Sequence, residues 1–133
     1  MEQHFFTFLL GINNDGSVNF SENSSKADVS LSNGAFVDVT AAGGGFITIN
    51  VNNLELSEQS NLFAGIGLDL GTSDTQGGDI TVNASGSVFL KNGSTIDIRN
   101  FGIGSTGEIA INAGDTVSLE GISSDRSSQI INV

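Results

Sequence analysis

One short text is written several times along this chain. The stretch Gly77–Gly93, GGDITVNASGSVFLKNG, recurs downstream as GEIAINAGDTVSLEG (Gly107–Gly121) and upstream as GFITINVNNLELSEQ (Gly45–Gln59). Its second half recurs as VSLSNGAFVDV (Val29–Val39). Copies that follow one another at intervals of roughly 30 residues are typical of architectures that stack one structural unit on the next.

Each copy contains short segments in which apolar and polar residues alternate, which predicts half-buried β-strands. We expect three strands per copy, and no segment has the spacing of an amphipathic helix. The first strand carries Ile47/Ile49, Ile80/Val82 and Ile109/Ile111; the second carries Val29/Leu31, Leu54/Leu56, Val88/Leu90 and Val117/Leu119; the third carries Val37/Val39, Leu62/Ala64 and Ile96/Ile98, completed by Ile131/Val133 or by Ile130.

The pattern predicts an all-β fold, a right-handed parallel β-helix with three strands per rung and about four rungs. We expect the repeats to occupy residues 27–133, and residues 1–26 to be an irregular segment or a partial rung with a strand at 17–20. Extra residues fall after the third strand, at 65–76, 101–106 and 121–128, where we expect loops. An antiparallel sandwich is the competing all-β interpretation, but it does not explain why the text repeats.

Three asparagines occupy equivalent positions at the end of the first strand: Asn50, Asn83 and Asn112. In a parallel stack they would lie above one another, and their amides would form a ladder from rung to rung. Asparagine is also a common turn residue, and a repeat copies its turns. The two interpretations are compatible.

Strand alternation turns four phenylalanines away from the core: Phe36, Phe46, Phe63 and Phe89. Either loops or further rungs cover them, or they form an exposed adhesive patch. We favour the first interpretation and keep the second as a candidate contact surface.

The charge balance excludes several functions. The chain has 15 acidic and 4 basic residues, a net charge of −11, which argues against binding to nucleic acid or to anionic lipid. The absence of cysteine removes thiol redox chemistry and cysteine-ligated zinc. The apolar run at 5–12 is too short to span a membrane, and no basic region precedes it as in a signal peptide. An acidic, glycine- and serine-rich surface suits an exported protein.

Acidic pairs are the residues to consider for catalysis, since polysaccharide-cleaving enzymes use two converging carboxylates. The pairs here are Asp69 with Asp74, and Asp79 with Glu108. They lie among small polar residues, so we interpret them as surface acids, and His4 likewise as a surface residue. No calcium-binding repeat, metal site or cofactor motif is present in the sequence. We therefore predict no catalytic, metal or cofactor-binding residues.

The repeated text resembles the filamentous-haemagglutinin-like large exoproteins of bacterial two-partner secretion. The resemblance lies in GGDITVNASGSVFLKNGSTIDI (Gly77–Ile98), GEIAINAGDTVSLEG (Gly107–Gly121) and VSLSNGAFVDV (Val29–Val39). It implies a segment of a long β-helical shaft, exported through an outer-membrane transporter and displayed as an adhesin outside the cell. The Asn-Pro-Asn-Gly motif of that family's secretion domain is missing, because the chain has no proline.

We therefore expect a non-catalytic structural or adhesive segment of a secreted or surface-displayed exoprotein, with an unknown cell-surface or glycan ligand. A polysaccharide-active β-helix enzyme using Asp79 and Asp97 is an alternative. A calcium-stabilised surface-layer module is another.

Overall fold

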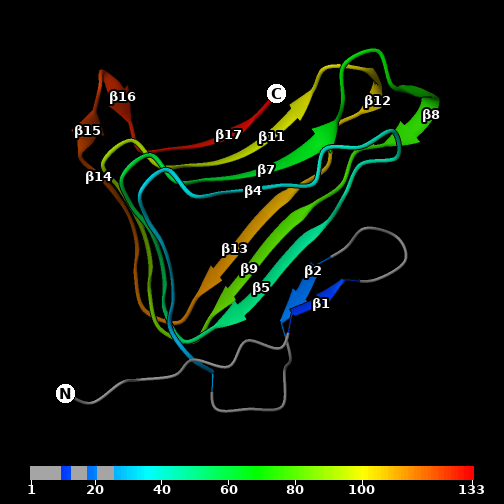
Figure 1. Cartoon of the computed structure of the whole chain (residues 1–133). Coiled ribbons are helices and arrows are strands. Elements are labelled where there is room, and N and C mark those ends of the chain that lie inside the picture. The colour runs from blue at the N-terminus through cyan, green and yellow to red at the C-terminus, as the bar shows by residue number, and fades with distance from the viewer. Residues whose placement is uncertain (1–9, 13–17, 21–25) are drawn as a thin grey trace.

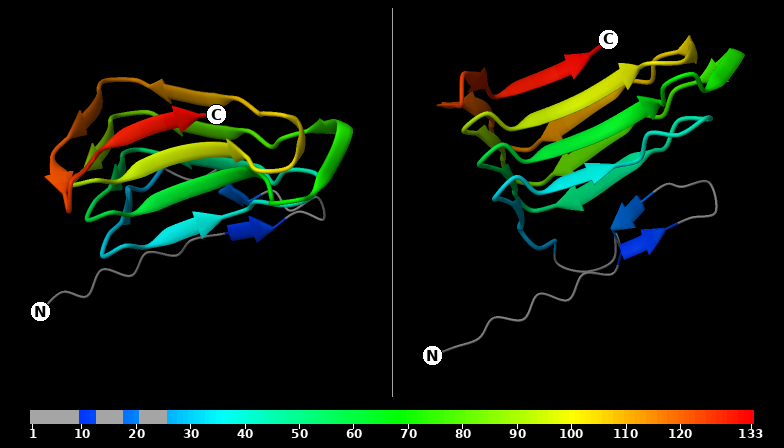
Figure 2. Two further views of the ribbon diagram at one scale, coloured as in Figure 1. Left: turned by 90° about the horizontal axis from the view of Figure 1, so that it is seen from above. Right: turned by 45° about the horizontal axis from the view of Figure 1, so that its top comes forward.

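The computed structural model describes residues 10–12, 18–20 and 26–133. All regular structure in these residues is β, and strands from successive repeats lie side by side in parallel sheets (Figures 1 and 2). This confirms the predicted all-β class and the parallel stacking, and the arrangement is consistent with a parallel β-helix.

Three sheets each collect one strand from every repeat. Sheet A contains, in spatial order, β1 (Leu10–Ile12), β2 (Val18–Phe20), β5 (Ile47–Val51), β9 (Ile80–Ala84) and β13 (Ile109–Ala113). Sheet B contains β3 (Val29–Leu31), β6 (Leu54–Leu56), β10 (Val88–Lys91) and β14 (Val117–Glu120). Sheet C contains β4 (Phe36–Asp38), β7 (Asn61–Ile66), β11 (Thr95–Asn100) and β17 (Gln129–Asn132). We call one set of strands, one from each sheet, a rung.

The pairing register places matching residues of the repeats in vertical columns. Ile47, Ile80 and Ile109 are aligned across sheet A. In sheet C, Leu62 and Ile96 are aligned with Ile130, so Ile130 completes the third-strand column, and Ile131 faces outward beside Asp97. Every strand pair between rungs is parallel, and the one antiparallel pair in the three sheets joins β2 to β1.

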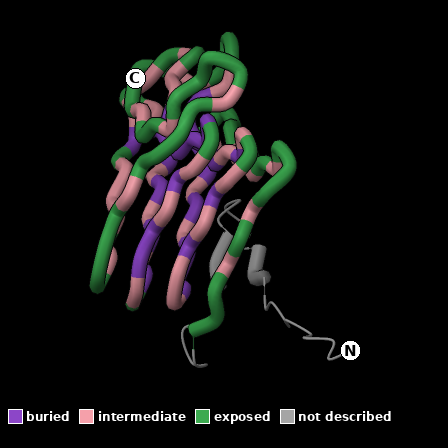
Figure 3. The backbone as a smooth tube through the Cα atoms, turned by 90° about the vertical axis from the view of Figure 1, so that its left-hand side faces the viewer, coloured by how far each residue is buried: buried purple, intermediate pink, exposed green. Residues whose placement is uncertain are grey.

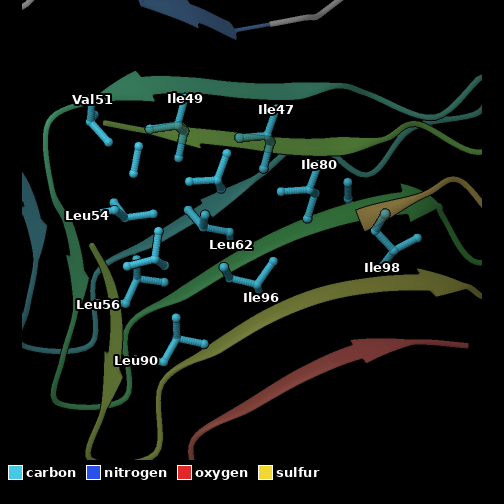
Figure 4. Packing of buried hydrophobic residues seen from close by; sticks show 14 residues of the cluster. Ile47, Ile49, Val51, Leu54, Leu56, Leu62, Ile80, Leu90, Ile96 and Ile98 are labelled. Atoms are coloured by element: carbon cyan, nitrogen blue, oxygen red, sulfur yellow. The ribbon is translucent and has the colours of Figure 1, made fainter. Parts of the chain in front are cut away.

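The inward side chains of the middle rungs form a continuous apolar core (Figure 4). Leu54, Leu56, Val88 and Leu90 of sheet B are fully buried there. Each such side chain contributes roughly 1.5–3 kcal/mol relative to an exposed one. Burial is concentrated in the middle strands, while the strands at both ends of the stack are more exposed (Figure 3).

The middle rungs carry more than the three predicted strands. Residues expected to form loops instead contain β8 (Gly71–Gln76) and β12 (Ile103–Ser105), which pair in parallel and extend sideways from the stack (Figure 1). We call this extension, residues 67–76 and 101–106, the lateral lobe. In the last rung, β15 (Ile122–Ser123) and β16 (Arg126–Ser127) form a small antiparallel hairpin. The prediction of plain loops at these places was wrong. The strands β8 and β12 form because backbone pairing between rungs continues without apolar alternation, whereas β15 and β16 pair with each other within one rung.

The turns between sheets B and C use left-handed backbone conformations. Asn33 and Asn92, each followed by glycine, have φ values of 58° and 52°. At the same corner of the second rung, Glu58 and Gln59 have φ values of 53° and 64°, although neither residue type is usual there. The fold therefore imposes this turn even where the sequence does not favour it.

The glycines that begin the repeats, Gly45, Gly78 and Gly107, lie above one another at a crowded corner. A Cβ atom on Gly78 would collide with the backbone carbonyl of Gly45 in the rung below. Only glycine allows the rungs to approach this closely.

We expect Gly78→Ala to lower the free energy of unfolding by more than about 2 kcal/mol, because the rungs must move apart to admit the methyl group. Gly43→Ala is the matched control, since its Cβ would have no neighbour within 4 Å; we expect it to change stability by less than about 0.5 kcal/mol. Urea unfolding followed by far-UV circular dichroism measures both, and equal effects would contradict the close approach.

Candidate functional site

The three predicted asparagines form a hydrogen-bonded column along sheet A. Asn50, Asn83 and Asn112 are aligned by the strand register. The Asn83 Nδ2 donates to Asn50 Oδ1 at 2.9 Å, and the Asn112 Nδ2 donates to Asn83 Oδ1 at 2.9 Å. This column satisfies side-chain amides that the corner partly removes from water, so its role is structural.

A second polar network joins the rungs between sheets A and B. One carboxylate oxygen of Asp28 accepts hydrogen bonds from Asn52 Nδ2 at 2.9 Å, from Asn53 Nδ2 at 2.9 Å and from the Asn53 backbone N–H at 3.0 Å. The Asn53 side chain in turn accepts from the Ser87 N–H at 2.7 Å. The pKa of Asp28 lies below its ordinary value of 3.8, because these hydrogen bonds stabilise the ionised carboxylate. The bond from the Asn53 side chain has the largest effect, followed by the bond from Asn52 and then by the bond from the Asn53 backbone.

The four predicted phenylalanines are distributed over all three sheets. Phe36 on β4 is 69% exposed, whereas Phe63 on β7, Phe89 on β10 and Phe46, which precedes β5, are half-buried. Phe36 and Phe63 both face outward from neighbouring strands of sheet C, but Phe46 and Phe89 belong to the other two sheets, so the described structure does not bring all four into one patch.

Phe89 forms part of a groove of about 380 Å³ on the outer face of sheet B. The Lys91 Nζ lies 5.0 Å from the centre of the Phe89 ring and 2.8 Å from Glu55 Oε2. This hydrogen bond to Glu55 raises the pKa of Lys91. The ring is therefore in contact with the protein's own ammonium group.

Four exposed apolar residues lie instead on the lateral lobe. They are Leu68, Leu70, Phe101 and Ile103, which are between 43% and 72% exposed. The two halves of the lobe are hydrogen-bonded: the Ile103 N–H donates to the Leu70 carbonyl at 2.8 Å, and the Phe101 N–H donates to the Ile66 carbonyl at 3.0 Å. The sequence marked these segments only as long loops, and the apolar residues in them were the available signal.

The predicted acidic pairs are separated by the structure into different roles. Asp79 is half-buried, and its Oδ1 accepts the backbone N–H of Glu108 at 2.7 Å, which ties one rung to the next; the Glu108 side chain is exposed. Asp69 lies in the turn between β7 and β8 with a φ of 59°, and Asp74 is exposed on β8. His4 lies outside the described residues.

Asp97, which faces outward from β11, is completely buried. The strand register places it between Phe63 and Ile131, two longer side chains on the neighbouring rungs. Its Oδ2 lies 2.6 Å from Nη2 of Arg99, so the carboxylate is paired within its own strand. A carboxylate without exposed surface cannot reach a polysaccharide in this conformation.

Within residues 10–12, 18–20 and 26–133, no group of three or more histidine, cysteine or acidic side chains is arranged to hold a metal ion. The same residues contain no helix of the length and apolarity needed to cross a bilayer.

No protein-family model, no curated protein and no solved structure matches this chain. The resemblance to the two-partner-secretion exoproteins therefore depends on the repeated text alone.

We expect Asn83→Ala to cost about 1–3 kcal/mol, because it removes both hydrogen bonds that Asn83 makes in the column, to Asn50 and from Asn112. Asn112→Ala breaks a single bond at the exposed end and should cost about 0.5–1 kcal/mol. Urea unfolding measures the two losses, and equal, negligible losses would show that the column does not stabilise the stack.

We expect the Asp28 network to make stability sensitive to acid. A lowered pKa means that the carboxylate stabilises the fold above pH 3.8, and that this contribution is lost as the pH falls through the folded-state pKa. The melting temperature of Asp28→Ala should therefore lie below that of the wild type at neutral pH and approach it at acid pH. Asp74→Ala, at an exposed position, is the control, and a gap for Asp28→Ala that does not narrow in acid would contradict the mechanism.

Proposed function

We propose that this chain is a structural and adhesive segment of a secreted or surface-displayed β-helical exoprotein, and that it catalyses no reaction. The observation that carries the proposal is an exposed apolar lobe held on a rigid parallel stack. The stack fixes the position of the lobe, and the lobe offers the kind of surface that binds a partner.

The rigid part of the proposal is supported by interactions that repeat from rung to rung. Asn83 bonds to both neighbouring asparagines, and Asp79 accepts the backbone of the next rung. Because each rung is held to the next over three sheets, the rungs form one stiff unit.

The adhesive part is supported by the lateral lobe. Leu68 and Ile103 are 72% and 60% exposed, although soluble proteins rarely collect large apolar side chains at a protruding edge. The lobe lies outside the three sheets, so its exposed side chains can vary without disturbing the core, whereas its glycines Gly71, Gly102 and Gly104 pack against the buried Ile66.

The acidic residues support a non-catalytic role more than the polysaccharide-enzyme alternative. Asp79 is engaged with a backbone N–H and Asp97 is buried against Arg99, so these two carboxylates serve the stack. Glycoside hydrolysis by the usual mechanism requires two carboxylates that converge on a cleft, whereas Asp79 and Asp97 are engaged in contacts within the stack.

Export through an outer-membrane two-partner-secretion transporter, and a location outside the cell, are part of the same proposal. They are supported by the resemblance of the repeats and by the acidic, cysteine-free composition. The ligand would be a component of another cell's surface, either a protein or a glycan.

We expect beads coated with this protein to adhere to cultured epithelial cells and to methyl-terminated glass. The variant L68S/L70S/F101S/I103S should reduce both several-fold, because it removes the exposed apolar surface while leaving the buried core unchanged. The matched control is I122S/V133S, which replaces two apolar residues that are similarly exposed, at 70% and 68%, but lie outside the lobe.

The adhesion assay requires that both variants keep the wild-type far-UV spectrum and melting temperature. Undiminished adhesion of the lobe variant, or an equal loss in the control, would overturn the proposed role of the lobe.

A further inference from the structure

The groove of about 380 Å³ on the outer face of sheet B crosses three consecutive rungs. Rungs stack along the axis whereas the groove opens sideways, so additional rungs would lengthen this face and leave the groove open. Its volume lies in the range of about 300–1,000 Å³ that is typical of ligand sites. Six residues at outward positions on β3, β6 and β10, or directly before these strands, line it: Asp28, Ser30, Asn53, Glu55, Ser87 and Phe89.

The free polar groups of this groove are mainly hydrogen-bond acceptors. Asn53 donates its amide to Asp28 Oδ1, and its own Oδ1 accepts the Ser87 N–H. Asp28 uses Oδ1 and Glu55 uses Oε2; within the described part of the chain, no hydrogen bond engages the second oxygen of either carboxylate. No lysine or arginine is among the lining residues. The groove therefore suits a ligand that donates hydrogen bonds and carries positive charge.

Phe89 and Glu55 already hold one cation, which belongs to the chain itself. The Lys91 Nζ lies 5.0 Å from the centre of the Phe89 ring and 2.8 Å from Glu55 Oε2. Lys91 does not line the groove, so its ammonium reaches this pair from outside it. The side chains of Lys91 and Glu55 are 36% and 39% exposed, and ion pairs in contact with water are weak. Another cation can therefore compete with Lys91 for the ring and the carboxylate.

The spacing of the two carboxylates selects the shape of the ligand. Glu55 is aligned with Ser30, two residues after Asp28, so the two acidic residues lie diagonally on neighbouring strands. With strands about 4.8 Å apart and a rise of about 3.3 Å per residue, their Cα atoms are about 8 Å apart. Alternate residues of an extended peptide point to the same side and are about 7 Å apart. Two basic residues separated by one other residue can therefore reach both carboxylates.

Arginine suits these positions better than lysine. Its guanidinium is planar and weakly hydrated, stacks on aromatic rings, and pairs with a carboxylate through two parallel hydrogen bonds. The ammonium of lysine is a strongly hydrated point charge that cannot combine these contacts. Phe89 and Glu55 offer a ring and a carboxylate next to each other, so a guanidinium can use both at once.

We propose that this groove binds an extended, basic segment of a partner protein through an Arg-x-Arg pair. One guanidinium stacks on Phe89 beside Glu55 and replaces the Lys91 ammonium, and the other pairs with Asp28. Lys91 is then a built-in competitor that keeps the affinity low. The net charge of −11 attracts such a segment from a distance. This goes beyond the proposed function, because it involves no residue of the lateral lobe.

An NMR titration of the isotope-labelled 133-residue chain with the peptide acetyl-Thr-Arg-Thr-Arg-Thr-amide, in about 0.15 M sodium chloride, tests the proposal. We expect saturable shifts centred on the amides of β6 and β10. The dissociation constant should be on the order of 1 mM, because the contacts are exposed. The same peptide with citrulline in place of both arginines keeps the shape without the charge, and it should not bind.

Lys91→Met should strengthen binding about three- to fivefold, because it frees Phe89 and Glu55 for the peptide. Arg126→Ala is the matched control, since it removes the same charge from an exposed position on β16, outside the groove. It should change the affinity by less than about 1.5-fold, because salt screens distant charges. Phe89→Leu and Glu55→Gln keep the size of the side chain, and each should weaken binding at least about threefold.

Equal binding of the citrulline peptide, shifts that do not saturate, or equal effects of Lys91→Met and Arg126→Ala would overturn the proposal. Melting temperatures establish that each variant is folded. Spermidine, titrated in parallel, separates a small polycation from a protein segment. It should bind more weakly than the arginine peptide; tighter binding at the same amides would overturn the assignment to a protein partner.

Discussion

The structure depends on parallel backbone hydrogen bonding between consecutive rungs. The register of this pairing places each residue directly above its counterpart in the neighbouring rung. The alignment of Ile47 with Ile80 and Ile109 fixes every other column of sheet A. A shift of one residue would turn the apolar side chains outward and the threonines inward. One pairing register therefore produces the asparagine column, the glycine corner and the apolar core.

This arrangement also explains how so acidic a chain builds a stable unit. Asp28 and Asp79 accept hydrogen bonds from the neighbouring rung, so their carboxylates help to hold adjacent rungs together. Asp97 is a different case, because it is buried on an outward face with Arg99 as its counter-ion. Removing one partner of a buried ion pair destabilises the fold by more than the intact pair stabilises it. Asp97 and Arg99 must therefore be kept or replaced together.

Much of the fold could be predicted from the sequence, because aligning the repeats shows which residues occupy the same column of the stack. The inward pairs and the equivalence of Asn50, Asn83 and Asn112 can be read from the text alone. The strand β8, with the sequence GTSDTQ, has no apolar alternation and forms because β12 lies beside it. The turn at Glu58 and Gln59 likewise has no local signal and follows its neighbouring rungs.

The candidate site was harder to predict, because it also depends on contacts between neighbouring rungs that local sequence does not reveal. Whether an outward residue is covered depends on side chains a full rung away: Asp97 is buried beneath Phe63 and Ile131, while Phe36 remains exposed. The apolar residues of the lobe become neighbours only when β8 and β12 pair. Alternation in the sequence distinguishes core-facing from outward-facing residues. It does not reveal which outward-facing side chains are covered by their neighbours.

The hydrogen bonds between rungs have a mechanical consequence. They run along the long axis of the stack, so tension on that axis loads all the bonds of one joint together, whereas a pull on a chain end would peel strands away in sequence. Asn83 follows Asn50 by 33 residues and Asn112 follows Asn83 by 29. Each peeled rung would then release on the order of 100 Å of chain. A tether built this way would yield stepwise under load and would dissipate energy at each step.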